Sequence, residues 1–129
     1  FQEYLASLKK ASLTVALFAG VQGNPVKSQV ASGVEAYRSL KSTQKDAAIL
    51  GIGGGAALDV AKAIALMVNH PGDIFDYEDE KPGALPIDKE IPYWVAMPTT
   101  AGTGSEVGRS AVVADDTTHV KKVIFSPRL

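Results

Sequence analysis

The sequence has 129 residues, of which 46% are hydrophobic and 21% charged, and its formal net charge is −1. This length is typical of one globular domain, and a near-neutral charge without a large Lys/Arg cluster argues against a nucleic-acid-binding surface. The absence of cysteine excludes a disulfide framework and a Cys-based zinc site and agrees with a cytoplasmic location, and no apolar run reaches the roughly 20 residues of a membrane span.

The first part of the sequence alternates helical and extended patterns. Residues 1–10 place apolar side chains on one face of an amphipathic helix, and residues 13–18 form an apolar, β-branched run typical of a strand. A turn over 20–25 precedes a second amphipathic helix over 26–40, in which apolar residues recur every three or four positions. The apolar run 47–52 predicts a strand that is covered on both faces.

The second part continues the alternation. Three glycines at 53–55 end the preceding strand, and a helix is predicted over 57–68. Residues 73–90 are acidic and interrupted by proline and glycine, so they predict an exposed excursion. Further strands are predicted over 93–97, 110–114 and 120–125. Because parallel neighbours need a crossover and helices supply it, this order predicts an α/β fold with a mostly parallel sheet flanked by helices.

Both ends of the sequence have the pattern of cuts. Residue 1 opens directly inside a helix, and residues 126–129 follow a strand without a terminating element. We therefore expect residues 1–129 to form a single α/β domain that is truncated at both ends.

Gly53, Gly54 and Gly55 lie between a predicted strand and a predicted helix. At such a position, unpaired backbone N–H groups and the helix dipole favour an anion such as phosphate. The alternative is a tight turn in which the glycines serve only positive φ angles. The three glycines alone leave both interpretations open.

Hydroxyl side chains follow the strand predicted over 93–97. Thr99, Thr100, Thr103 and Ser105 are donors that suit phosphate oxygens and carboxamides, and a Thr/Ser-capped turn is the alternative. Since ligands bind at the carboxyl ends of parallel strands, this loop and the glycine turn both lie where a ligand is expected.

Asp59 and Lys62 lie one and two turns into the helix predicted over 57–68. Their three-residue spacing lets them pair on a helix surface, so the favoured interpretation is a solvated ion pair. The alternative is that Asp59 holds nearby backbone or a ribose hydroxyl.

The remaining polar residues predict no catalytic or metal site. His70 and His119 have no second ligand at a metal-binding spacing. We expect His70 to be a helix-end residue and His119 to be an exposed turn or strand-edge residue. Lys121 and Lys122 are expected on a solvated strand face. No hydroxyl has a recognisable base partner, so a hydrolase triad is not predicted.

Two longer segments resemble the motifs of the iron-containing (group III) alcohol dehydrogenase family. They are GGGAALDVAK at 53–62 and PTTAGTGSE at 98–106, in this order and at about this separation. The segments 20–25 and 119–122 also agree with that family, so the resemblance covers nearly the whole chain.

The resemblance implies a Rossmann-like, dehydroquinate synthase-like domain that binds NAD or NADP. It implies an enzyme that moves hydride between nicotinamide and a small alcohol or aldehyde, with Fe²⁺ or another divalent metal such as Zn²⁺ polarising the substrate oxygen. By the same resemblance, the glycine turn receives the pyrophosphate, Asp59 lies near the nicotinamide side, the threonines line the cleft and Lys121 approaches the nicotinamide ribose. The implied cofactor-binding residues are Gly53, Gly54, Gly55, Asp59, Thr99, Thr100, Thr103 and Lys121.

This sequence also departs from the family pattern. Ala56 stands where many members have serine, so one hydroxyl contact to phosphate is lost. The family's strand that distinguishes NAD from NADP would precede residue 1, and its metal ligands belong to a helical domain that would follow residue 129. We therefore expect the chain itself to be inactive and to need that C-terminal helical domain, and we allow for a homo-oligomer.

Two alternatives to this function stay open. One is a related reductase of the same superfamily that acts on maleylacetate, a polyol or a hydroxy acid, because substrate choice resides mainly in the absent part. The other is a nucleotide-binding module without catalysis.

Overall fold

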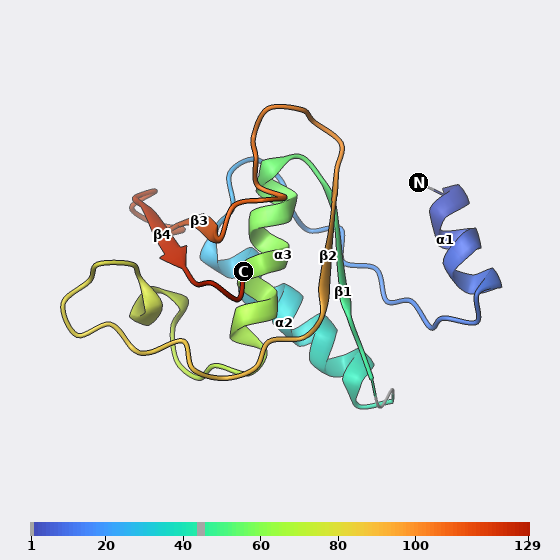
Figure 1. Ribbon diagram of the computed structural model, residues 1–129, viewed down its shortest axis with the longest axis horizontal. Helices are drawn as coiled ribbons and strands as arrows, with labels where there is room; N and C mark the ends of the chain where they lie inside the picture. The colour runs from blue at the N-terminus through green and yellow to red at the C-terminus, as the bar shows by residue number, and fades with distance from the viewer. Residues whose placement is uncertain (1, 44–45) are drawn as a thin grey trace.

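The computed structural model describes residues 2–43 and 46–129, which form three α-helices, one short 3₁₀-helix and four strands (Figure 1). The elements are, in order, α1 (Gln2–Lys10), α2 (Lys27–Lys41), β1 (Ile49–Gly53), α3 (Gly55–Met67), η1 (Ile74–Tyr77), β2 (Trp94–Pro98), β3 (Ser110–Ala114) and β4 (Lys121–Phe125). The helices predicted over 26–40 and 57–68 are confirmed to within two residues, and so are the strands predicted after residue 40. Phe1, the first residue of the first predicted helix, lies outside the described residues.

The four strands form two separate pairs within the described part of the chain. β1 and β2 are parallel, with Ile49 opposite Trp94, whereas β3 and β4 are antiparallel. The expectation of an α/β fold with parallel strands flanked by helices is confirmed, but the expectation of a mostly parallel sheet is wrong. The physical reason is the short connection between β3 and β4, because a link of a few residues permits only a hairpin, whereas parallel strands need a long crossover.

Helix α3 lies at the centre of the molecule, between the β1–β2 pair on one side and the β3–β4 hairpin on the other (Figure 1). Helix α2 packs against it as well. Since three neighbours cover it, α3 is apolar around nearly its whole circumference, as expected of a buried helix. This placement fixes the N-terminus of α3 beside the ends of β1 and β2.

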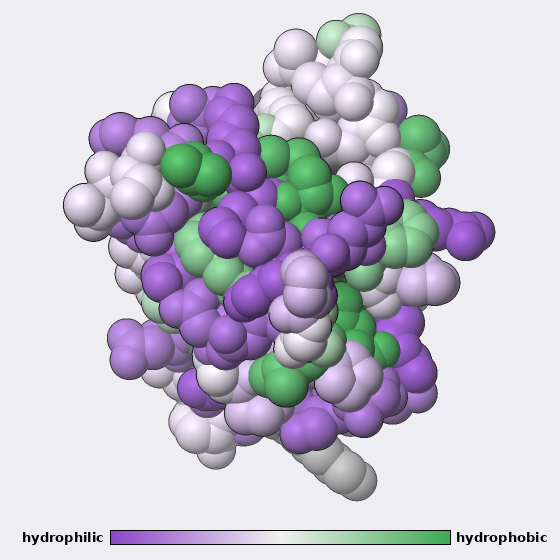
Figure 2. All heavy atoms as spheres, turned by 90° about the vertical axis from the view of Figure 1, so that its left-hand side faces the viewer, coloured by the Kyte–Doolittle hydropathy of each residue, from purple (hydrophilic) through white to green (hydrophobic). Residues whose placement is uncertain are grey.

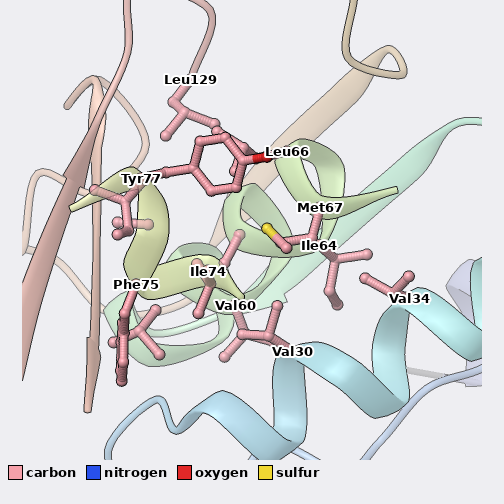
Figure 3. Packing of buried hydrophobic residues seen from close by; sticks show 14 residues of the cluster. Val30, Val34, Val60, Ile64, Leu66, Met67, Ile74, Phe75, Tyr77 and Leu129 are labelled. Atoms are coloured by element: carbon pink, nitrogen blue, oxygen red, sulfur yellow. The ribbon is translucent and has the colours of Figure 1, made fainter. Parts of the chain in front are cut away.

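The core forms where α2, α3 and η1 meet (Figure 3). Val34 of α2 lies beside Ile64 of α3 and Val30 lies beside Val60, and the two helices approach closely at Gly33. A Cβ atom at Gly33 would lie 2.1 Å from Ile64 Cδ1, so any larger residue there forces the helices or the isoleucine to move.

The strand predicted over 13–18 is absent from the structure, and this prediction is wrong. Leu13 and Leu17 are 55% and 59% exposed, and only Phe18 and Val21 pack against the core from this region. A strand persists only when another strand accepts its backbone hydrogen bonds. No described segment pairs with residues 13–18, so their β-favouring composition is not sufficient.

The excursion predicted over 73–90 is only partly exposed. Residues 80–86 lie in solvent, but Ile74, Phe75 and Tyr77 of η1 are buried. Asp73 begins η1 by accepting a hydrogen bond from the Phe75 N–H (2.9 Å). The expectation of exposure is therefore wrong for η1, because its three apolar side chains complete the core.

The β1–β2 pair is covered on one face only by the described residues. Leu50 and Val95 are 38% and 39% exposed on the other face, so the prediction of a strand covered on both faces is wrong. Helix α1 stands apart from the strands and buries none of its residues (Figure 1).

The surface around β4 and the 73–90 segment is mainly hydrophilic, with small separate hydrophobic patches (Figure 2). None of the helices in residues 2–43 and 46–129 has both the length and the apolar composition that a membrane span requires. The cytoplasmic location expected from the sequence stays a prediction.

Candidate functional site

The glycine turn connects β1 to α3, and its three glycines differ in conformation. Gly53 has φ +150°, and a Cβ atom there would lie 2.6 Å from the Cβ atom of Ala57. Gly54 is the N-cap of α3 with φ −75°, and Gly55 is the first helical residue. A need for positive φ therefore explains only Gly53.

The threonine-rich loop 99–106 lies directly against this turn. The Thr99 N–H donates to the Gly53 carbonyl (2.8 Å), and a Cβ atom at Gly54 would lie 3.3 Å from Thr100 Oγ1. A Cβ atom at Gly55 would lie 3.1 Å from Ser105 Oγ. The two loops singled out from the sequence are thus neighbours in the fold, and the small size of Gly54 and Gly55 allows this close approach.

The N-terminus of α3 has the properties of an anion site. Its N-cap residue, Gly54, makes no side-chain hydrogen bond to the helix. The first N–H groups of a helix have no acceptor within the helix, and the dipole adds positive potential at this end. Ala56 contributes no hydroxyl group here, so backbone N–H groups are the donors that the first turn offers.

A pocket of about 330 Å³ opens beside this helix end. Its volume lies at the lower end of the range of small-molecule sites. It is lined by Asn24, Pro25, Gly55, Ala56, Asp59, Thr103, Ser105, Val112, Ala114 and Lys121.

Four of the eight residues predicted to bind the cofactor line this pocket: Gly55, Asp59, Thr103 and Lys121. The other four belong to the same two loops, in which Gly53 contacts Thr99 and Gly54 contacts Thr100. The structure therefore brings the predicted residues together in one region. Their role in binding stays a prediction.

The sequence analysis missed the pocket residues that come from other parts of the chain. Asn24 and Pro25 belong to the turn before α2, whose agreement with the family pattern was the available signal. Val112 and Ala114 belong to β3, and no local pattern marks them. They reach the pocket because Ala114 pairs with the start of α2, where its N–H donates to the Pro25 carbonyl (2.8 Å).

Asp59 is half-buried in the pocket wall, and one of its carboxylate oxygens accepts the Val112 N–H (3.2 Å). Burial raises the pKa of this carboxyl group, while the Val112 N–H, the Lys62 ammonium and the Ser105 hydroxyl act in the opposite direction. The interpretation that Asp59 holds nearby backbone is thus confirmed. The interpretation that the sequence favoured, a solvated ion pair with Lys62, is wrong.

Lys62 is completely buried, with 0% of its surface exposed. Its ammonium donates to the carbonyl oxygens of Gly108 (2.7 Å) and Ser110 (2.9 Å) and lies 5.7 Å from the ring centre of Trp94. Burial lowers the pKa of this ammonium, and the carboxylates of Asp59 and Glu106 oppose that shift. The surface position expected for Lys62 is wrong because α3 has no solvated face here.

Lys121 and Lys122 point to opposite faces of β4, as successive strand residues do. Lys121 is exposed and lines the pocket. Lys122 lies 2.5 Å from a Glu78 oxygen and 5.2 Å from the ring centre of Phe75. The expectation of a solvated face is therefore wrong for Lys122, which belongs to the packing between β4 and η1.

The two histidines have structural surroundings. His70 is buried at the end of α3, where Nε2 accepts the Lys89 N–H (3.2 Å). Because that nitrogen accepts, Nδ1 carries the proton and donates to the Leu66 carbonyl (2.8 Å). His119 lies in an exposed turn with φ 59°. Both positions agree with the sequence prediction.

Within the described residues, no three His, Cys, Asp or Glu side chains lie together as a metal site would require. The described residues therefore offer no cluster of side chains that could hold a divalent metal. The expectation that the metal ligands follow residue 129 stays a prediction.

Comparison with known proteins identifies relatives over the whole chain. The family model for iron-containing alcohol dehydrogenases matches residues 1–129. The chain is 38% identical to a choline dehydrogenase of Bacillus subtilis over 91% of its own length and 28% of the relative. It is 34% identical to an NAD-dependent methanol dehydrogenase of Bacillus methanolicus, over 99% of the chain and 32% of that relative.

A solved structure agrees with the fold. The crystal structure of a 1,3-propanediol oxidoreductase superposes with a TM-score of 0.85 at 35% identity, covering 98% of this chain and 31% of the other. The chain thus spans about a third or less of the length of the relatives that it matches.

Proposed function

Because the chain belongs to the iron-containing alcohol dehydrogenase family, we propose that it is the nucleotide-binding part of an NAD(H)-dependent dehydrogenase. The observation that carries this proposal is the meeting of the glycine turn and the threonine-rich loop at one pocket. A turn that served only the chain reversal would not need hydroxyl side chains packed against an uncapped helix end.

The chemistry of the pocket suits a dinucleotide. A diphosphate would bind at the N-terminus of α3, where backbone N–H groups and the helix dipole favour negative charge. Thr103 and Ser105 offer hydroxyl donors to the pocket, and Lys121 offers a cation. Asp59 presents a carboxylate that would accept a ribose hydroxyl while it holds β3. When bound, the nicotinamide supplies the hydride acceptor or donor.

We propose a small alcohol or aldehyde as the substrate and NAD(H) as the cofactor. The named relatives act on choline, methanol and 1,3-propanediol, and the methanol enzyme is named as NAD-dependent. A divalent metal, Fe²⁺ or Zn²⁺, belongs to the same proposal for the complete protein. Its ligands would come from the part of the relatives that this chain does not match.

The proposal predicts that Lys121 contributes to dinucleotide affinity. In the complete protein that contains this chain, Lys121→Ala should weaken NADH binding by roughly tenfold, or about 1.4 kcal/mol, because one cation beside the anionic ligand is lost. The effect should diminish as salt is added, since Lys121 is exposed and salt screens exposed charges. Fluorescence titration of NADH at low and high salt measures both effects.

The matched control is Lys122→Ala, which removes the same charge from the neighbouring residue on the opposite face of β4. Its NADH affinity should stay within about twofold of the parent protein, whereas its thermal stability should fall slightly with the loss of the Glu78 ion pair. Equal affinity losses in both variants would show that net charge, rather than the pocket, determines binding. Unchanged affinity in Lys121→Ala would contradict the assignment of this pocket.

A further inference from the structure

Among the described residues, strand β3 pairs with another strand, β4, along one of its two edges. In the antiparallel pair with β4, alternate residues of β3 direct their N–H and C=O groups toward β4 or away from it. The Val112 N–H donates to Asp59, so Ser110, Val112 and Ala114 form the edge that faces away from β4. This second edge lies against α3 and lines the pocket at Val112 and Ala114, and at its end Ala114 forms a single bridge with Val26.

Two side chains of α3 hold that edge. Asp59 accepts the Val112 N–H (3.2 Å), and Lys62, one turn later, donates to the Ser110 carbonyl (2.9 Å). The edge of a strand offers N–H and C=O groups in alternation. Here the carboxylate accepts an N–H group and the ammonium donates to a C=O group of the same edge. The two side chains thus take the place of a neighbouring strand.

Lys62 also holds the base of the threonine-rich loop. Its second hydrogen bond goes to the Gly108 carbonyl (2.7 Å), and the Gly108 N–H donates to the Gly104 carbonyl (2.9 Å). Gly104 lies between Thr103 and Ser105, the two loop residues in the pocket wall. Lys62 therefore connects two of the segments that line the pocket, β3 and the threonine-rich loop, although it does not line the pocket itself.

Lys62 occupies a position that an apolar residue would fill at lower cost. Burying an ammonium carries a large desolvation penalty, and replacement of buried charges by apolar residues often stabilises a protein. The other fully buried side chains of α3, such as Leu58 and Leu66, are apolar. A buried cation with two backbone carbonyls and an aromatic ring around it points to a need for a fixed geometry at this place.

We propose that Lys62 is a positioning residue of the cofactor pocket. Its ammonium fixes the edge of β3 and the base of the threonine-rich loop relative to the N-terminus of α3. This inference rests on the proposed function, since the pocket that it positions is the dinucleotide pocket. Without the ammonium, β3 and the threonine-rich loop are no longer held in fixed positions relative to each other. The cofactor then has to order them when it binds, which lowers its affinity.

The test replaces the ammonium and keeps the space filled. In the complete protein, Lys62→Met removes the charge and the three donors, while Lys62→Gln keeps an N–H donor without the charge. The control is Lys81→Met, because the Lys81 ammonium also donates to a backbone carbonyl, that of Phe75 (2.9 Å), but in a segment that does not line the pocket. NADH affinity, the fraction of active sites and thermal stability are measured for each variant.

We expect Lys62→Met to fold, to titrate one NADH per pocket and to bind it at least tenfold more weakly than the parent protein. Lys62→Gln should lie between the two, and Lys81→Met should match the parent. Hydrogen exchange of the amides over 103–112 should accelerate in Lys62→Met and not in Lys81→Met. A residue that served stability alone would lower the thermal midpoint or the active fraction and leave the dissociation constant of the folded molecules unchanged.

Three results would overturn the inference. They are an NADH dissociation constant of Lys62→Met within twofold of the parent, unaltered hydrogen exchange over 103–112, and failure of both Lys62 variants to fold, which would assign Lys62 to the fold as a whole. NADH binding by the parent protein shows whether the proposed function or only the role of Lys62 has failed. If the parent itself binds no NADH, the proposed function fails, whereas tight binding by both the parent and Lys62→Met refutes only the role of Lys62.

Discussion

At the scale of single residues, Asp59 and Lys62 show where sequence reasoning reaches its limit. Their spacing predicts an ion pair on a helix surface, and this holds for amphipathic helices. Helix α3 is covered on several sides, so Lys62 is buried and Asp59 half-buried, and their partners are backbone groups of residues 108–112. Such partners lie about 50 positions away along the chain, beyond any local pattern.

The raised pKa of Asp59 predicts a specific dependence of stability on pH. When the pKa of a carboxyl group is higher in the folded state, the folded state holds more protons, so the free energy of unfolding falls as pH rises through the window above the ordinary value of 3.8. Asp59→Asn has no charge to desolvate and keeps an oxygen that accepts the Val112 N–H. We expect the variant to gain stability relative to the parent as pH rises through this window, with a constant difference above it.

Urea denaturation of the parent and Asp59→Asn, from about pH 3.5 to 7, measures this difference. At the lowest pH the two proteins should approach each other in stability. A difference that is independent of pH would show that burial and the opposing interactions cancel at Asp59. A variant that loses stability as pH rises would show that those interactions outweigh burial.

At the scale of helices and strands, the sequence predicts elements well wherever their apolar pattern meets a partner in the fold. Helices α2 and α3 and strands β1 to β4 follow from their patterns to within two residues. Residues 13–18 have an equally good strand pattern but no described strand to pair with. Residues 74–77 belong to an acidic segment that the sequence predicts to be exposed, yet their three apolar side chains are in the core. Pairing and packing decide both cases, and neither is local.

The contact between α2 and α3 predicts a cost for enlarging Gly33. Its Cβ position lies 2.1 Å from Ile64 Cδ1, so the steric overlap in Gly33→Ala should lower the free energy of unfolding by about 1–3 kcal/mol. The higher helix propensity of alanine offsets about 1 kcal/mol of this loss. Ile64→Val removes that Cδ1 atom. The double variant should therefore be more stable than the sum of the two single changes predicts, and urea denaturation of the four proteins measures the coupling.

Ser32→Ala is the control for this cycle, because Ser32 precedes Gly33 in the same helix but is exposed. It should be neutral or slightly stabilising, as alanine favours helices. If Gly33→Ala were as harmless as Ser32→Ala, the helices would not be in the close contact that the structure shows. Additive effects of Gly33→Ala and Ile64→Val would lead to the same conclusion.

At the scale of the whole molecule, the topology predicts where the candidate site lies, but it does not predict all of the residues that line it. Ligands bind at the carboxyl ends of parallel strands, and the loops after β1 and β2 do meet there. The remaining pocket wall comes from the turn before α2 and from the β3–β4 hairpin. That hairpin is joined to the turn by the bridge between Val26 and Ala114, which no sequence motif announces.

We expect one dinucleotide to contact both the glycine turn and the threonine-rich loop. Titration of the isotopically labelled complete protein with NAD(H), followed by amide resonances, detects both contacts in one experiment. The amides of Gly54, Gly55 and Thr103 should shift together with one common dissociation constant, while those of α1 and of residues 80–86 stay unchanged. Saturable binding that leaves the Gly54 and Gly55 resonances in place would show that the dinucleotide does not bind at the glycine turn.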